Sequence, residues 1–249
     1  MTPASAISGR IQDFFPVSLL SRKRERIEER AGAESNLVFQ RTIYGLYAIT
    51  PDCPDTGRLL RQARQALTGG ARVLQYRNKA ADGALRREQA TALRELAREF
   101  SATYIVNDDA QLAMQVGADG VHLGAEDGGL DAARALLGPD KILGASCYNR
   151  LPLARAAIAA GADYVAFGAF FPSGVKPGAV KADVEVLRQA RAEFDVPLVA
   201  IGGITLQNAV LLVEAGADAL AVISALFDAA DIQRTARDFS GLFTRNLAS

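Results

Sequence analysis

The 249-residue chain has few of the features that define several large classes of protein. Its only two cysteines, Cys53 and Cys147, form neither a disulfide framework nor a metal-ligand pattern, so a reducing compartment is the default. Acidic and basic residues balance to a formal net charge of zero, and no global field favours nucleic acid or an anionic membrane. Charges interrupt every apolar run before it reaches the roughly 20 residues that span a bilayer. The N-terminus also lacks the apolar core of a signal peptide. We therefore expect a cytoplasmic protein with no nucleic-acid or membrane partner.

The first 42 residues differ in composition from the rest of the chain. Residues 21–30 are a dense run of mixed charge with one clear apolar residue, Ile27, and a polar helix of this length is marginally stable alone. We expect a polar, partly disordered N-terminal extension over residues 1–42. A docking or oligomerisation arm, or a translation start assigned too early, would give the same pattern. The folded domain is expected to cover residues 43–249.

From residue 44 onward, apolar runs typical of strands alternate with helical stretches such as residues 85–100 and 183–194. The strands are expected at residues 44–50, 72–77, 103–106, 119–123, 141–145, 163–168, 197–201 and 218–223. Four glycines each precede a strand and suit the left-handed position that ends a helix: Gly70, Gly117, Gly161 and Gly216. Strand–helix alternation requires a parallel sheet, and eight units are enough to close it. The sequence predicts an α/β protein with a single (β/α)8 TIM barrel.

Polar residues follow several of these apolar runs, where a barrel carries its chemistry. Gln75, Arg77 and Lys79 alternate at the end of the second strand, and period-two geometry points them to one side. Arginine and lysine suit phosphate oxygens. Ser146 follows the fifth strand in the same way. These residues predict a binding site for an anion at this rim.

Acidic residues follow the third and fourth strands. Asn107 and Asp108 come first, and Asp109 is expected to cap the helix that begins at Ala110. Asp127 lies one βα unit after Asp108, and two neighbouring carboxylates repel each other unless a cation lies between them. We therefore expect Asp108 and Asp127 to bind Mg²⁺. His122 is the only histidine, and a lone histidine on a strand is more often structural than catalytic.

The last three strands contribute a loop and two turns. Residues 170–178 are rich in glycine and proline and include Ser173 and Lys176, which predicts a long loop that covers the site. Gly203 follows the seventh strand, and Ile223 and Ser224 end the eighth. Phosphate sites in these barrels often form after strands seven and eight, so a phosphate group is expected there.

Over roughly residues 44–230 the chain resembles the thiamine-phosphate synthase family. The resemblance rests on the segments Leu46-Tyr47-Ala48-Ile49-Thr50, Gln75-Tyr76-Arg77-Asn78-Lys79, Asn107-Asp108-Asp109, Gly120-Val121-His122-Leu123-Gly124-Ala125-Glu126-Asp127 and Gly202-Gly203-Ile204-Thr205. It implies a transferase that condenses a hydroxymethylpyrimidine diphosphate with a thiazole phosphate, giving thiamine phosphate and pyrophosphate through a dissociative, Mg²⁺-assisted step. The implied partners are these small molecules, and a homo-oligomer is compatible with the resemblance.

The resemblance also assigns roles to residues. Arg77, Lys79, Ser146 and Lys176 are expected to be catalytic. The residues expected to bind substrate are Gln75, Arg77, Lys79, Asn107, Ser146, Ser173, Lys176, Gly203, Ile223 and Ser224. Two positions depart from the family. Asn78 stands where many members carry Glu, and Val175 stands where a Thr often precedes the lysine of the covering loop, here Lys176. Two alternatives stay open, a thiazole tautomerase that uses a histidine base and a non-catalytic sensor of phosphate ligands on the same barrel.

Overall fold

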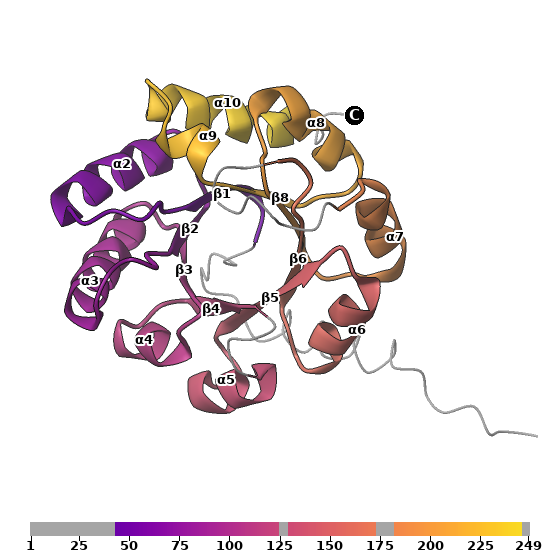
Figure 1. Cartoon of the computed structure of the whole chain (residues 1–249), viewed down its shortest axis with the longest axis horizontal. Coiled ribbons are helices and arrows are strands. Elements are labelled where there is room, and N and C mark those ends of the chain that lie inside the picture. Colours follow the sequence, from indigo (N-terminus) through magenta and orange to yellow (C-terminus); the bar gives the residue numbers. More distant parts are fainter. Residues whose placement is uncertain (1–42, 125–128, 173–181, 246–249) are drawn as a thin grey trace, which may run out of the picture. The chain divides into compact units, whose positions relative to one another are not determined.

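The computed structural model describes residues 43–124, 129–172 and 182–245. Within these ranges, eight parallel strands pair in sequence order and β8 closes on β1 (Figure 1). The strands are β1 Gly45–Ile49, β2 Val73–Tyr76, β3 Thr103–Asn107, β4 Gly120–Leu123, β5 Ile142–Tyr148, β6 Tyr164–Phe167, β7 Leu198–Ile201 and β8 Ala219–Val222. The predicted (β/α)8 barrel is confirmed. The predicted extension over residues 1–42 lies outside the described residues and stays a prediction.

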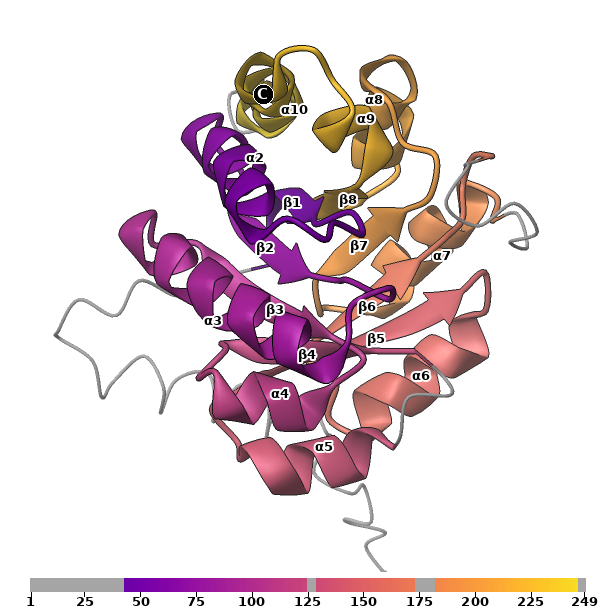
Figure 2. The same ribbon diagram turned by 60° about the vertical axis from the view of Figure 1, so that its left-hand side comes forward.

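The helices form a ring outside the strands (Figure 1). They are α2 Thr56–Thr68, α3 Gly83–Glu99, α4 Ala110–Gln115, α5 Leu130–Leu137, α6 Leu151–Ala159, α7 Glu185–Glu193, α8 Leu206–Glu214, α9 Ser224–Phe227 and α10 Ile232–Arg245. Figure 2 shows α2 and α3 side by side along the outside of the first strands. The helices expected at residues 85–100 and 183–194 are α3 and α7. Among the described residues, no helix is both long and apolar enough to cross a bilayer.

Local sequence signals set the ends of these helices. Four helices begin directly after an aspartate whose carboxylate accepts a backbone N–H of the first turn: Asp55 for α2, Asp82 for α3, Asp109 for α4 and Asp231 for α10. The four glycines predicted to end helices all have positive φ: Gly70, Gly117, Gly161 and Gly216. Both kinds of signal therefore place the strands where the sequence predicts them, to within a few residues.

Alternate residues of each strand belong to two separate cores. On β1, Leu46 and Ala48 pack outward against the helices, whereas Tyr47 and Ile49 face the barrel interior. Phe167 on β6 is fully buried in the outer layer. The alternation follows from the period of two along a strand. It also determines which side chains at the strand ends reach the interior and the rim.

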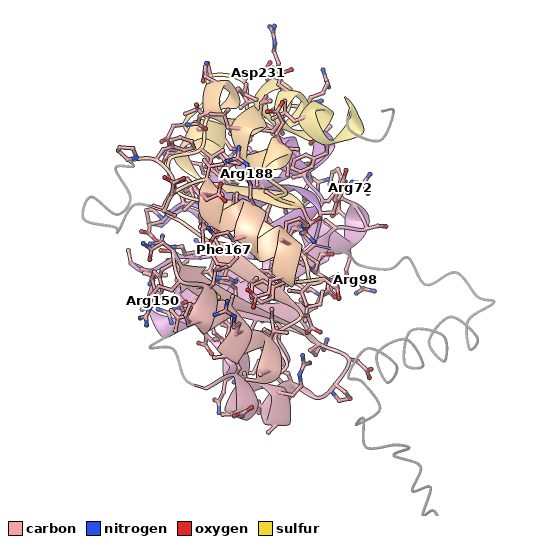
Figure 3. The ribbon with its side chains drawn as sticks, turned by 90° about the vertical axis from the view of Figure 1, so that its right-hand side faces the viewer. Arg72, Arg98, Arg150, Phe167, Arg188 and Asp231 are labelled. Atoms are coloured by element: carbon pink, nitrogen blue, oxygen red, sulfur yellow. The ribbon has the colours of Figure 1, made fainter. Side chains whose placement is uncertain are left out.

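The two ends of the barrel are distinct in a side view (Figure 3). Arg150, just after β5, lies at one end. Arg72, just before β2, and Arg98, in the last turn of α3, lie at the other end. The carboxyl ends of the parallel strands therefore share the end marked by Arg150. The predicted site residues follow the strands and belong to that rim.

Candidate active site

Two basic side chains lie at the carboxyl end of β2. The Arg77 side chain is only 13% exposed, and its Nη1 lies 3.1 Å from Asp52 Oδ1. The Lys79 side chain is half exposed, and its Nζ lies 3.1 Å from Asp108 Oδ2, in the loop after β3. Because β2 ends at Tyr76, Lys79 reaches the rim from the loop and not from an extended strand. The basic residues after β2 and the acid after β3 meet at one rim, as predicted.

The loop after β1 holds this basic segment in place. Asp52 Oδ1 accepts the Lys79 backbone N–H at 2.7 Å in addition to the Arg77 guanidinium. The Thr50 hydroxyl donates to the Arg77 carbonyl at 2.9 Å and accepts the Arg77 N–H at 2.8 Å. Sequence reasoning missed Asp52 because it lies in another loop. The pairing of Ile49 with Gln75 is the signal, since it places the residues after β1 beside those after β2.

Asn78 lies behind the basic segment and not in the site. Its Nδ2 donates to the Cys53 carbonyl at 2.8 Å and to Gln89 Oε1 at 3.0 Å. Its Oδ1 accepts the N–H groups of Ala80 and Ala81, both at 3.2 Å. The residue is 5% exposed. Asn78 therefore affects the site through the shape of the loop that carries Arg77 and Lys79.

The end of β3 separates a rim carboxylate from a capping one. Asn107 is the last residue of β3, on the same face as the interior Ile105. Asp108 has a φ of +64°, and its N–H donates to the His122 carbonyl at 2.8 Å. This turn leaves the Asp108 side chain 29% exposed beside Lys79. Asp109 Oδ1 accepts the Leu112 N–H at 2.8 Å, so its predicted role as the cap of α4 is confirmed.

Of the two carboxylates predicted to bind Mg²⁺, the structure describes only that of Asp108. The Asp108 carboxylate is a hard oxygen donor at an accessible rim, the type of ligand that Mg²⁺ prefers. Asp127 lies outside the described residues. Within the described ranges, no three acidic, histidine or cysteine side chains gather in a metal cage. Asp108 therefore fits the donor chemistry of Mg²⁺, and the metal site stays a prediction. Ser173, Val175 and Lys176 also lie outside the described residues.

A row of hydrogen-bonded polar side chains crosses the barrel interior. Gln75 Nε2 donates to the Tyr47 hydroxyl, which lies 2.9 Å from the Tyr164 hydroxyl. The Tyr164 hydroxyl lies 2.9 Å from His122 Nδ1, and His122 Nε2 lies 2.9 Å from Ser146 Oγ. Burial raises the pKa of both phenols well above the ordinary value of a tyrosine. The row joins Gln75 and Ser146, two predicted site residues, through Tyr47, Tyr164 and His122, none of which was among the residues predicted to be catalytic or to bind substrate in the synthase.

Gly144 makes room for this row. A Cβ at this position would lie 2.0 Å from Tyr164 Cζ and 2.3 Å from its hydroxyl. The interior face of β5 therefore needs a residue without a side chain where the Tyr164 ring crosses. A glycine inside a strand indicates a close approach, and this was the signal in the sequence for the tyrosine. β5 also continues beyond its predicted end to Tyr148, with an irregular register between Ser146 and Tyr148.

Glycine turns follow β7 beside the end of β8. Gly203 has a φ of +63°, and a Cβ there would lie 2.5 Å from the carbonyl oxygens of Phe171 and Pro172. Ile223 precedes α9, and Ser224 is the first residue of that helix. Since β7 pairs with β8, the three residues predicted to bind a phosphate come from neighbouring strand ends. Position 203 therefore needs a glycine, because the backbone of residues 171–172 occupies the space of a Cβ.

Cys147 is not a reactive group of this site. It is fully buried in the outer layer, and burial raises the pKa of its thiol to about 12. A thiol with this pKa is protonated at neutral pH and is a poor nucleophile.

The rim of this barrel carries two basic side chains, an accessible carboxylate and a glycine turn. These features are typical of (β/α)8 enzymes that act on anionic small molecules. Residues 46–226 match the family model described as thiamine monophosphate synthase. The chain is 59% identical over 201 residues to a thiamine-phosphate synthase of Methylobacillus flagellatus, covering 81% of this chain and 96% of that one. The corresponding protein of Thiobacillus denitrificans is 55% identical over 199 residues, covering 80% and 94%.

A solved structure is also similar to this chain in sequence and in fold. The thiamine phosphate pyrophosphorylase of Pyrococcus furiosus is 36% identical, with a TM-score of 0.75, and the match covers 83% of this chain and 98% of that one. The chain belongs to the thiamine monophosphate synthase family.

Proposed function

We propose that the chain catalyses the thiamine-phosphate synthase reaction. The substrates would be a hydroxymethylpyrimidine diphosphate and a thiazole phosphate, and the products thiamine phosphate and pyrophosphate. The observation that carries the proposal is the pair Arg77 and Lys79, both held by Asp52 at the rim where Asp108 lies. This pair suits a diphosphate leaving group, and the chain's relatives are named for the same synthase.

The reaction exchanges one bond for another without a change of oxidation state. The bond between the pyrimidine methylene carbon and the diphosphate oxygen breaks, and the electron pair leaves with pyrophosphate. The thiazole nitrogen then donates its lone pair to the methylene carbon. No strong base is required, because neither step removes a proton from carbon. The protein must mainly stabilise the negative charge that develops on the leaving oxygen.

Arg77 and Lys79 would supply that stabilisation. The guanidinium of Arg77 is protonated at any physiological pH, and its ion pair with Asp52 fixes its position before the substrate arrives. Such preorganised charge avoids reorganisation as the bond breaks. Asn107, Ser146 and Lys176 would add hydrogen bonds to the same diphosphate, and Ser173, three positions before Lys176, would also bind substrate.

Mg²⁺ would add positive charge to the diphosphate oxygens when it is bound. Asp108 and Asp127 would hold the ion. Lys79 lies 3.1 Å from the Asp108 carboxylate in this structure, so the lysine and the cation would share one anionic region. At the ends of β7 and β8, Gly203, Ile223 and Ser224 would bind the thiazole phosphate through backbone N–H groups. Gln75 would orient the pyrimidine from the barrel interior.

The position of His122 favours the synthase over a tautomerase. Both of its ring nitrogens lie 2.9 Å from hydroxyl oxygens, of Tyr164 and Ser146. A histidine in this arrangement holds neighbouring groups and is poorly placed to remove a proton from a substrate. We expect the enzyme to work in the cytoplasm, and a homo-oligomer remains part of the hypothesis.

Incubation of the full chain with both substrates, with and without Mg²⁺, tests the proposal by the mass of the product. We expect thiamine phosphate only when both substrates and Mg²⁺ are present. Tight binding of thiazole phosphate without any product would favour the sensor, and conversion of a single thiazole phosphate isomer would favour the tautomerase.

Two adjacent aspartates provide a matched pair of variants. Asp108→Ala should reduce turnover strongly and leave the affinity for thiazole phosphate nearly unchanged. Asp109→Ala should leave most of the turnover but destabilise the fold by about 1 kcal/mol, because it removes the cap of α4. Equal losses of turnover and of thiazole-phosphate affinity in Asp108→Ala would contradict the assigned metal site.

A further inference from the structure

The hydrogen bonds of the polar row inside the barrel share one donor-to-acceptor direction, which runs from Gln75 toward His122. Among the described residues, Tyr47 contacts Gln75 and Tyr164 through its hydroxyl, and Tyr164 contacts Tyr47 and His122. Gln75 donates through Nε2, so the Tyr47 oxygen accepts this hydrogen bond and the Tyr47 proton goes to Tyr164. Tyr164 must then donate its own proton to His122 Nδ1. Each hydroxyl has one proton, and the amide at one end therefore sets the order of the whole row.

Both phenols keep their protons at neutral pH, since burial disfavours the phenolate form. A histidine whose Nδ1 accepts a proton carries its own proton on Nε2. His122 Nε2 lies 2.9 Å from Ser146 Oγ, which then accepts. Within the described part of the chain, His122 is the only side chain that hydrogen-bonds to Ser146. The Ser146 proton is consequently left for a ligand.

We propose that the row from Gln75 through Tyr47 and Tyr164 holds His122 as the Nε2–H tautomer and so makes Ser146 a hydrogen-bond donor to the bound anion. His122 and Tyr164 are positioning residues in this scheme, since they act through Ser146. The inference rests on the proposed function only for the identity of that anion, the diphosphate.

The opposite order of the row would have the opposite effect. With the Gln75 amide oxygen facing Tyr47, every proton would reverse, and Ser146 would donate to His122 Nε2. Its lone pairs would then face the site and repel a diphosphate oxygen. The tautomer of one buried histidine thus decides whether the Ser146 hydroxyl attracts or repels the anion.

Nitrogen-15 NMR of the imidazole ring tests the tautomer directly in the full chain. His122 is the only histidine, so the ring signals need no assignment by mutagenesis. We expect a protonated Nε2 and an unprotonated Nδ1. Tyr164→Phe should weaken this preference, because it removes the donor to Nδ1. A protonated Nδ1 in the wild-type protein, alone or in an imidazolium ring, would overturn the inference.

Pyrophosphate affinity, measured by calorimetry at a fixed Mg²⁺ concentration, tests the link to Ser146. Ser146→Ala should weaken binding about tenfold and Tyr164→Phe about fivefold. The double variant should bind no more weakly than Ser146→Ala. Tyr104→Phe is the matched control, because its fully buried hydroxyl donates to the Ala90 carbonyl in the outer layer. Multiplied losses in the double variant, or an equal loss in Tyr104→Phe, would reject the role of Tyr164.

The two measurements separate this inference from the proposed function. The expected tautomer in a chain that makes no thiamine phosphate would leave the row intact and reject the synthase. Product formation in a chain with a protonated Nδ1 would leave the synthase intact and reject the orientation of the row.

Discussion

Replacement of Asn78 by alanine should destabilise the protein by about 3 kcal/mol, although the side chain lies outside the site. The amide takes part in four hydrogen bonds, two as donor and two as acceptor. The Cys53 carbonyl would keep its bond from Gln89 Nε2, and Gln89 Oε1 its bond from the Tyr76 hydroxyl. Each of these two losses therefore costs about 1 kcal/mol.

The other two bonds differ in their surroundings. Ala80 is exposed, so water replaces the partner of its N–H at little cost. Ala81 is 9% exposed, at the limit of burial, so its unpaired N–H costs about 1 kcal/mol, the lower end of the range for a buried donor. The sum is about 3 kcal/mol. With a slope of about 2 kcal/mol per molar urea, the midpoint of unfolding should fall by about 1.5 M.

Urea unfolding followed by far-ultraviolet circular dichroism measures this change. Asp82→Ala is a suitable control. It removes one exposed capping hydrogen bond from α3, the helix that carries Gln89, and should cost about 1 kcal/mol. A midpoint for Asn78→Ala within 0.3 M of the wild type, roughly 0.6 kcal/mol on the same slope, would mean that the buried amide network does not form.

Three further changes test other parts of the structure. Gly144→Ala places a methyl group 2.0 Å from Tyr164 Cζ and should cost roughly 1–3 kcal/mol in urea unfolding; wild-type stability would refute the close approach. Gly203→Ala sets a Cβ against the Phe171 carbonyl and should weaken thiazole-phosphate binding at least about tenfold by calorimetry, whereas an unchanged affinity would remove this turn from the phosphate site. The free energy of unfolding should fall by roughly 1.4 kcal/mol per pH unit between about pH 9 and 10, because the unfolded Cys147 thiol ionises there and the buried one, with a pKa of about 12, does not. Cys147→Ala should remove this slope; tyrosines add a similar loss only above about pH 10.

The barrel and much of its rim follow from local patterns in the sequence. Alternation of helix and strand gives the fold, and the period of two identifies Gln75 as an interior residue. Asp109 is recognisable as a cap because it stands directly before the first turn of a helix. These features depend on neighbours in sequence, and sequence patterns describe such neighbours well.

The contacts that sequence reasoning missed join residues that are distant along the chain. Asp52 acts on Arg77 and Lys79 from another loop, and its role depends on the register of two strands. Tyr47 and Tyr164 appear in sequence as ordinary members of apolar strands, yet their hydroxyls meet inside the barrel. No local sequence pattern predicts the contact between these two hydroxyls. It follows from the closure of the sheet, which directs the side chains of β1 and β6 into one small interior.

The close approach of Gly144 and Tyr164 has an evolutionary consequence. The aromatic ring fills the space that a side chain at the paired position of the neighbouring strand would need, so the two positions share one volume. A relative that gains a side chain at position 144 must lose the ring at position 164, and a relative that keeps the ring must keep the glycine. These two positions should therefore change together across the family, although they lie on different strands and only one of them has a side chain.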